Sequence, residues 1–247
     1  MNPLSVVIIT LNEAKRIEKC LLSIQDVADE IVVVDAFSTD QTQAICEKLG
    51  ARFIQRKWTN FGDCKRFATQ MATHDTILSL DADEVVSEEL KLSIQHVKAN
   101  WGEADAYHFK RLNFVGDKAI RYGAWYPDCK IRLFDRRKAN WTDVPVHEVI
   151  GSTTKDCVVG HLQGNLLHYS FESAEALLNS PKTKLYTGMY RHKKKIAKPL
   201  VFLKAGFSFL KSYVFKLGLL DGKLGCTVAR SGMKYTLLKY QNPQGFS

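Results

Sequence analysis

Two acidic residues stand two positions apart at the end of an apolar segment of the chain. Asp81 and Asp83 follow the segment TILSL, and Glu84 comes next. Mg²⁺ and Mn²⁺ prefer a site with few carboxylates, and they let phosphate oxygens complete the coordination octahedron. The pattern therefore predicts that Asp81 and Asp83 hold a diphosphate through one of these cations. It is also typical of a helix N-terminus, where acidic side chains interact favourably with the helix dipole and need no metal.

Polar residues follow two other apolar segments in the same way. Asp35 ends the segment EIVVVD and precedes a polar turn. Its carboxylate can accept hydrogen bonds from a nucleobase N–H or from ribose hydroxyls. Thr10, Asn12 and Glu13 end the first apolar segment and offer further acceptors. A turn or a helix N-cap is the alternative role for each of them.

Apolar and amphipathic segments alternate along residues 1–100. We expect strands at residues 4–10, 30–35, 52–56 and 76–80, and helices at residues 12–24, 40–49, 61–73 and 87–99. This alternation predicts an α/β fold with a mostly parallel sheet and flanking helices. Ligands of such sheets bind beyond the carboxyl ends of the strands, so the polar residues above should share one edge. Residues 106–168, rich in aromatic and short strand-like segments, should add a β-rich portion.

The formal net charge of +9 is unevenly distributed. Residues 176–247 carry fourteen Lys or Arg and a single acid, Asp221, for a net charge of +13, whereas residues 1–175 carry −4. We therefore predict a domain at residues 1–175 and a basic helical C-terminal extension at residues 176–247. The six cysteines have neither metal-site nor disulfide-framework spacing, which indicates reduced thiols and a cytoplasmic location. We expect no signal peptide and no membrane span, because every apolar run is too short.

Basic residues of the extension alternate with large apolar ones. Between residues 176 and 220 there is no acid, and lysines are mixed with Leu, Val, Phe and Tyr. Such a mixture on helices is typical of a protein that binds an anionic membrane surface peripherally. A nucleic-acid patch is the competing interpretation, but no RNA or DNA motif accompanies it, so we expect no nucleic-acid partner. Packing of these helices on the main body is the third alternative.

The segments VVIITLNEA, IVVVDAFSTDQT, the helix of Lys65 and LSLDADE, in this order and spacing, resemble the nucleotide-sugar domain of the inverting family 2 glycosyltransferases. The resemblance implies the GT-A fold of nucleotide-diphospho-sugar transferases, a UDP-sugar donor and a Mg²⁺ or Mn²⁺ cofactor. It places uridine against Asn12, Glu13 and Asp35, and the metal on Asp83. Asp81 would contact the ribose and the metal region. Lys65 would lie near the base or the diphosphate.

Later segments resemble a bacterial subgroup of that family that adds sugars to the lipopolysaccharide core. They are CKIRLFDRR, VPVHEVI, LLHYSF and FLKSYVFKLGLLDGKLG. The subgroup includes β-1,4-glucosyltransferases that act on core heptose. The resemblance therefore implies a lipid-linked saccharide acceptor, glucose as the sugar transferred, and a peripheral position on the inner face of the cytoplasmic membrane. His147-Glu148 stands where many family members carry a Glu-Asp pair.

An inverting transfer needs a base that removes the proton of the acceptor hydroxyl. This base must be separate from the metal ligands, because a carboxylate held by a cation is a weak base. Glu148 is our candidate for this base, and Asp128, which follows Trp-Tyr-Pro, is the second candidate. The alternative is that Glu148 is only an acid on the protein surface. His168 is a candidate third metal ligand or else a core histidine. Arg132 and Lys182 or Lys184 are candidates to neutralise the charge of the diphosphate. The alternative function for the whole protein is binding of a nucleotide sugar without catalysis.

Overall fold

The computed structural model describes residues 2–142, 148–180 and 197–241. Contacts between Cα atoms divide the chain into two compact units. Unit 1 comprises Met1–Arg111 and Cys129–His168, and unit 2 comprises Leu112–Asp128 and Tyr169–Ser247. Unit 2 thus includes residues from both sides of position 175. The division into a domain at residues 1–175 and an extension at residues 176–247 stays a prediction.

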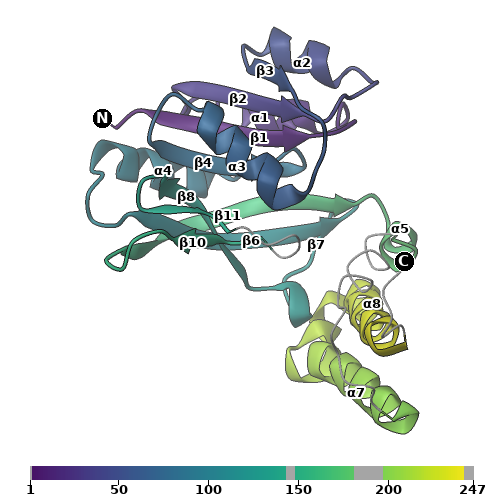
Figure 1. The fold of residues 1–247 in the computed structure, drawn as a ribbon. Coiled ribbons are helices and arrows are strands. Elements are labelled where there is room, and N and C mark those ends of the chain that lie inside the picture. The colour runs from purple at the N-terminus through teal and green to yellow at the C-terminus, as the bar shows by residue number, and fades with distance from the viewer. Residues whose placement is uncertain (1, 143–147, 181–196, 242–247) are drawn as a thin grey trace. The chain divides into compact units, whose positions relative to one another are not determined.

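The first half of unit 1 is built on four parallel strands in the order β3-β2-β1-β4. They are β1 (Leu4–Thr10), β2 (Glu30–Asp35), β3 (Arg52–Gln55) and β4 (Thr76–Asp81). Every residue of β1 is buried, as expected for a central strand that is covered on both faces. The α/β fold class is therefore confirmed (Figure 1).

Helices cover both faces of these strands. They are α1 (Ile17–Leu22), α2 (Thr42–Lys48), α3 (Phe61–Met71) and α4 (Glu88–Ala99). Side chains of β1 alternate between two hydrophobic clusters, one shared with α1 and α4 and the other with α3. Polar side chains start two of the helices, because Asn60 accepts a hydrogen bond from Asp63 N and Ser87 accepts one from Leu90 N.

The predicted helix at residues 12–24 is wrong at its start, because α1 begins only at Ile17. Asn12 has a left-handed φ of 54°, which asparagine tolerates better than most residues. Its N–H donates to Ser38 Oγ at 2.7 Å, and its side-chain oxygen accepts from Thr39 N at 2.8 Å. These bonds to the loop after β2 replace the bonds that a helix would make.

Beyond β4 the sheet continues as β8-β6-β11-β5, and β4 pairs antiparallel with β8. The strands are β5 (Glu84–Val86), β6 (Ala106–Val115), β8 (Asp128–Asp135) and β11 (Val159–Phe171), with β7 (Lys118–Ala119) beside β6. β9 (Ala139–Trp141) and β10 (Ile150–Ser152) form a separate pair. The β-rich portion expected at residues 106–168 is therefore present.

Unit 2 is mainly helical. Its elements are η1 (Gly123–Trp125), α5 (Ala174–Leu178), α7 (Lys198–Leu210), the π-helical turn η2 (Lys211–Phe215), η3 (Gly218–Asp221) and α8 (Gly222–Gln241). Val115, Ile120, Leu177 and Val228 form its small core. The expected helices of the C-terminal extension are present in its described part. Among the described residues, no helix combines the length and the apolar character needed to cross a bilayer.

Candidate active site

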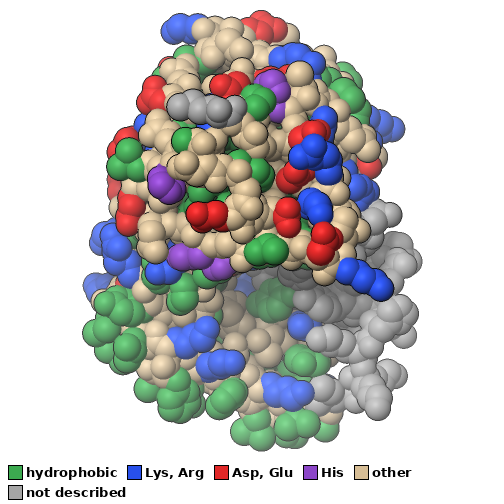
Figure 2. Space-filling model, turned by 90° about the vertical axis from the view of Figure 1, so that its left-hand side faces the viewer, with side chains coloured by type: hydrophobic (Ala, Val, Ile, Leu, Met, Phe, Trp, Pro, Cys, Tyr) green, Lys and Arg blue, Asp and Glu red, His purple; other side chains and the backbone are tan. Residues whose placement is uncertain are grey.

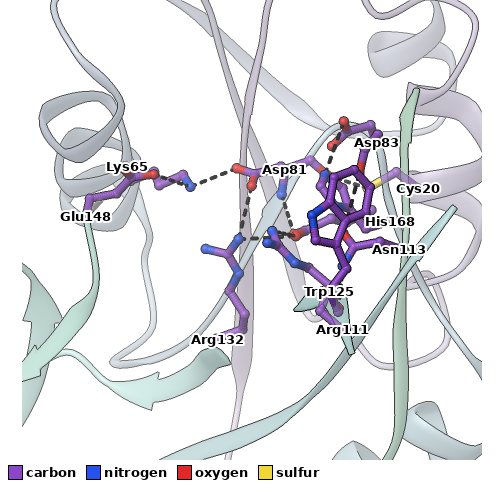
Figure 3. Close-up of polar contacts among 12 residues, drawn as sticks. Cys20, Lys65, Asp81, Asp83, Arg111, Asn113, Trp125, Arg132, Glu148 and His168 are labelled. Carbon is purple, nitrogen blue, oxygen red and sulfur yellow. Dashed lines mark hydrogen bonds and ion pairs between the residues drawn. The ribbon is translucent and has the colours of Figure 1, made fainter. Parts of the chain in front are cut away.

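Asp81, the last residue of β4, lies between two basic side chains. Its Oδ1 is 2.9 Å from Lys65 Nζ, and its Oδ2 is 3.0 Å from Arg132 Nη2 (Figure 3). Lys65 comes from α3 and Arg132 from β8, and both side chains are almost fully buried. Burial raises the pKa of the Asp81 carboxyl, but Lys65 and Arg132 outweigh it and hold the pKa well below its usual range. Asp81 is therefore ionised and already neutralised within the protein.

Asp83 pairs with a different partner. Its Oδ2 lies 3.4 Å from His168 Nε2, and the two side chains are 14% and 16% exposed. The antiparallel pairing of β11 with β5 explains this contact, because it sets His168 opposite Glu84, the residue after Asp83. The strand pairing thus brings a late histidine to the acidic motif.

The Asp83–His168 pair fits a divalent cation. Adjacent ligands of an octahedral ion with bonds of about 2.1 Å stand about 3 Å apart, close to the observed spacing. Among the described residues, no group of three or more His, Cys, Asp or Glu side chains could hold a metal by itself. One carboxylate and one imidazole would therefore leave several positions for phosphate oxygens and water, as Mg²⁺ prefers.

Glu84 was missed by the sequence reasoning. Its side chain is fully buried, and its Oε1 lies 3.1 Å from Arg132 and 3.3 Å from Arg111. Its Oε2 accepts a hydrogen bond from the backbone N–H of Asp81 at 2.9 Å. The signal in the sequence was the position of this acid at the start of the apolar segment EVV, where a charged side chain needs buried partners.

Glu148 is held by the same lysine that contacts Asp81. Glu148 Oε1 lies 3.1 Å from Lys65 Nζ, so the lysine bridges two carboxylates (Figure 3). The ring of Trp141 lies beneath both cations, with its centroid 4.6 Å from Lys65 Nζ and 5.2 Å from Arg132 Cζ. Glu148 thus contacts Lys65, whereas Asp83 contacts His168.

The polar residues of the first two strands meet at the same edge of the sheet. Thr10 pairs in register with Asp35 across β1 and β2, and Ile9 pairs with Asp81 across β1 and β4. Asp35 is fully buried and accepts a hydrogen bond from Ser38 N at 2.7 Å, so it fills the turn role that the sequence left open. Glu13 N donates to Thr42 Oγ1 at 3.0 Å, which ties the first strand end to the start of α2.

Residues 5–154 match the protein family described as Glycosyl transferase family 2. The chain belongs to this family. Uncharacterized glycosyltransferase RP128 of Rickettsia prowazekii is 32% identical over 235 residues, which cover 87% of this chain and 78% of that protein. Uncharacterized glycosyltransferase RT0209 of Rickettsia typhi is 36% identical over 193 residues, covering 72% and 64%. The chain therefore matches slightly less than two thirds of that relative's length.

Two solved structures are similar to this chain in fold. TarS 1-349 of S. aureus is 17% identical with a TM-score of 0.49, and the alignment covers 98% of this chain and 92% of that one. Glucosyl-3-phosphoglycerate synthase of Mycobacterium tuberculosis, solved with Mn²⁺ and UDP, is 23% identical with a TM-score of 0.37, over 46% and 44% of the chains.

The family 2 chain brings together six of the residues expected at its site. Lys65, Asp81, Asp83, Arg132, Glu148 and His168 all belong to unit 1 and come from α3, the β4–β5 region, β8, the segment before β10, and β11. Thr10, Asn12, Glu13 and Asp35 lie at the same edge of the parallel strands. Asp128 belongs to unit 2, where it begins β8. Lys182, Lys184 and His147 lie outside the described residues.

Proposed function

We propose that this family 2 protein is an inverting glycosyltransferase that moves a sugar from a UDP-sugar to a saccharide hydroxyl. The observation that supports the proposal is that a candidate metal site and a candidate base lie at the same edge of the sheet. One is the Asp83–His168 pair, with donor atoms spaced as the ligands of a cation. The other is Glu148, a carboxylate that Lys65 holds close to Asp81. A cation at the first site would stabilise the leaving group, and the carboxylate of Glu148 would remove the proton of the acceptor hydroxyl.

The charges of the site suit a metal-bound diphosphate. Asp81, Glu84 and Glu148 contact three basic side chains, Lys65, Arg111 and Arg132, and a fourth carboxylate, Asp83, pairs with His168. The carboxylates therefore outnumber the cations by one, so the site attracts a divalent cation rather than a bare anion. Mg²⁺ or Mn²⁺ held by Asp83 and His168 would stabilise the negative charge of the departing diphosphate. Arg132 and Lys65 would add fixed positive charge beside it.

The chain's own residues supply the remaining chemistry. The acceptor oxygen attacks the anomeric carbon and forms a new C–O bond, while the bond from that carbon to the diphosphate oxygen breaks. Glu148 takes the hydroxyl proton in the same step. The contact with Lys65 Nζ at 3.1 Å fixes the Glu148 carboxylate in place. Thr10, Asn12, Glu13 and Asp35 would contact the uridine at the neighbouring strand ends, with Lys182 a further candidate beside the diphosphate.

A donor screen tests this function. Purified protein is mixed with several UDP-sugars, with Mg²⁺ or Mn²⁺ or with EDTA, and release of free UDP is measured with and without a lipopolysaccharide core acceptor. We expect UDP release that requires the metal and increases with the acceptor, with UDP-glucose as the best donor. Binding of a UDP-sugar without any turnover would instead support the alternative, a nucleotide-sugar-binding protein.

We further propose that the acceptor is lipid-linked and that unit 2 binds the anionic inner face of the cytoplasmic membrane. The inward side chains of α7, Val201 and Ala205, are 4% and 2% exposed. On the outer side, Leu203 and Phe207 are 70% and 59% exposed. Figure 2 displays hydrophobic side chains with Lys and Arg among them on this unit. Such a surface inserts apolar groups at the headgroup boundary while lysines contact anionic lipid.

Vesicle cosedimentation tests this surface. We expect binding to vesicles that contain phosphatidylglycerol, weaker binding to pure phosphatidylcholine, and loss of binding in the double variant Leu203→Ser, Phe207→Ser. The matched control is Leu92→Ser, which removes a leucine of unit 1 that is 65% exposed. Equal binding by the double variant and the wild type would contradict the proposal.

A further inference from the structure

Two histidines of unit 1 face each other on neighbouring strands. His108 lies in β6 and His161 in β11, and these strands are neighbours in the sheet (Figure 1). Their Nδ1 atoms are 3.4 Å apart, and their ring centroids are 4.7 Å apart with the rings tilted by 39°. His161 is exposed and His108 is half-buried, so an ion in the solvent can reach the pair.

Backbone contacts set the two histidines side by side. Asp105 N donates to the carbonyl of Val158 at 2.9 Å, and Val158 N donates to the Asp105 carboxylate at 2.9 Å. Each histidine follows one of these two residues by three positions. Hydrogen bonds near both ends of the strands show that β6 and β11 run in the same direction. Equal steps along the two strands therefore bring His108 next to His161.

The residues beside the histidines anchor their backbone. Tyr107 and Leu162 are buried in the larger hydrophobic cluster, and each is next in sequence to one of the histidines. A Cβ on Gly160 would lie 2.7 Å from the Tyr107 ring, closer than real Cβ contacts allow, so a glycine is required for this packing. Because side chains alternate along a strand, the two imidazoles lie on the opposite face of the sheet from this cluster.

The spacing of the two nitrogens matches that of neighbouring ligands of zinc. Zinc binds histidine nitrogen at about 2.0–2.1 Å in tetrahedral geometry, so two of its ligand atoms stand about 3.3–3.4 Å apart. The distance between Nδ1 of His108 and Nδ1 of His161 is 3.4 Å. Imidazole suits Zn²⁺ better than Mg²⁺, which prefers oxygen ligands in an octahedron. Rotation of the two rings would direct both lone pairs at one ion.

The protonation of the pair also favours a metal. A histidine must be neutral to bind a metal ion. Burial, and then the charge of His161, lower the pKa of His108, so His108 is neutral at pH 7. Two facing nitrogens can share only one proton in a hydrogen bond, and two charged rings this close would repel each other. A zinc ion can take the place of the shared proton.

We propose that His108 and His161 form a zinc site that links β6 to β11, with two coordination positions left for water or for a ligand from outside the chain. A site with two protein ligands agrees with the finding that, within the described ranges, no cluster of three or more His, Cys, Asp or Glu could hold a metal. His168 lies seven residues after His161 on β11, which separates them by roughly 20 Å along the strand. The zinc site is therefore distinct from the candidate Mg²⁺ or Mn²⁺ site and independent of the proposed function.

Calorimetric titration with Zn²⁺ tests this site in the full-length protein. All variants carry Asp83→Ala, which removes one ligand of the candidate active-site pair. We expect His108→Asn and His161→Asn each to weaken zinc binding at least about tenfold, since even the loss of an outer-shell partner weakens metal binding by about 10–100-fold. The matched control, His96→Asn, removes an exposed histidine of α4 and should leave zinc binding unchanged. Mg²⁺ should not compete with Zn²⁺ for the site.

A variant that keeps a zinc ligand separates metal binding from a purely structural role. Cysteine thiolate binds zinc, so His161→Cys should retain the zinc binding that His161→Asn loses. Zinc should raise the Tm of the protein with either ligand at this position and not that of His161→Asn, because an ion that binds the native state stabilises it.

Two results would overturn the inference. One is unchanged zinc affinity in both asparagine variants, and the other is the absence of zinc binding when both histidines are present. Should His108→Asn fail to fold, His161→Asn decides by the same titration, because its side chain is exposed. Neither readout involves UDP, so the failure of this inference and the failure of the proposed function are distinguishable.

Discussion

Replacing Glu84 by Gln should destabilise the protein strongly, although the change removes only a charge. The Glu84 side chain is fully buried and contacts Arg132 at 3.1 Å and Arg111 at 3.3 Å. Removing one partner of a buried ion pair costs about 3–5 kcal/mol, because the other charge stays buried. Arg132 keeps Asp81 at 3.0 Å, and the Gln carbonyl can still accept from Asp81 N, so we expect the lower end, about 3 kcal/mol. For a protein of this size that lowers the Tm by roughly 6–12 °C.

Differential scanning calorimetry of Glu84→Gln against Glu88→Gln measures this effect. Glu88 makes an ion pair of similar length, 2.9 Å to Lys91, but its side chain is 83% exposed. Exposed pairs contribute little, and the position of Glu88 in the first turn of α4 adds only a small dipole term, so its loss should cost below about 1 kcal/mol. Similar Tm shifts in the two variants would show that burial of the Glu84 ion pair does not determine the loss of stability.

Two further predictions concern the base and the acid stability. Glu148→Gln should lower turnover at least about 100-fold and leave UDP binding by calorimetry unchanged, whereas Asp128→Asn, its rival, should stay within about tenfold; unchanged turnover in Glu148→Gln would remove that residue from the mechanism. Burial raises the pKa of Glu30, but hydrogen bonds from Ser5 and Thr73 outweigh it and lower the pKa. Its stabilisation is therefore complete above the unfolded pKa of about 4.3 and is lost as the pH falls through the folded pKa. Thermal melts from pH 6 to pH 3 should show a smaller loss for Glu30→Gln than for the wild type, and parallel curves would contradict this assignment.

The parallel strands and the sheet edge could be predicted because their signals are local. Buried strands such as β1 are continuous apolar runs, and a polar residue marks the end of each. Since parallel strands end at the same edge, Thr10, Asp35 and Asp81 had to lie near one another. The start of α1 could not be predicted in this way, because Asn12 bonds to Ser38 and Thr39 of another loop.

Contacts between residues that are distant in the sequence could not be predicted from local residue patterns. The Lys65–Glu148 pair joins residues 83 positions apart, and His168 reaches Asp83 only through the antiparallel pairing of β11 with β5. Glu84 was overlooked because two acids of the same motif accounted for the predicted metal site. Asp221 was counted only as charge, although its carboxylate accepts hydrogen bonds from the backbone N–H groups of residues 121 and 122.

A crystal structure with UDP and Mn²⁺ would test the candidate metal site at Asp83 and His168, because manganese can be located by its anomalous scattering. We expect one strong anomalous peak about 2.1 Å from Asp83 Oδ2 and His168 Nε2, in contact with the diphosphate oxygens of UDP. A manganese ion bound elsewhere, with Asp83 and His168 still paired only to each other, would contradict it.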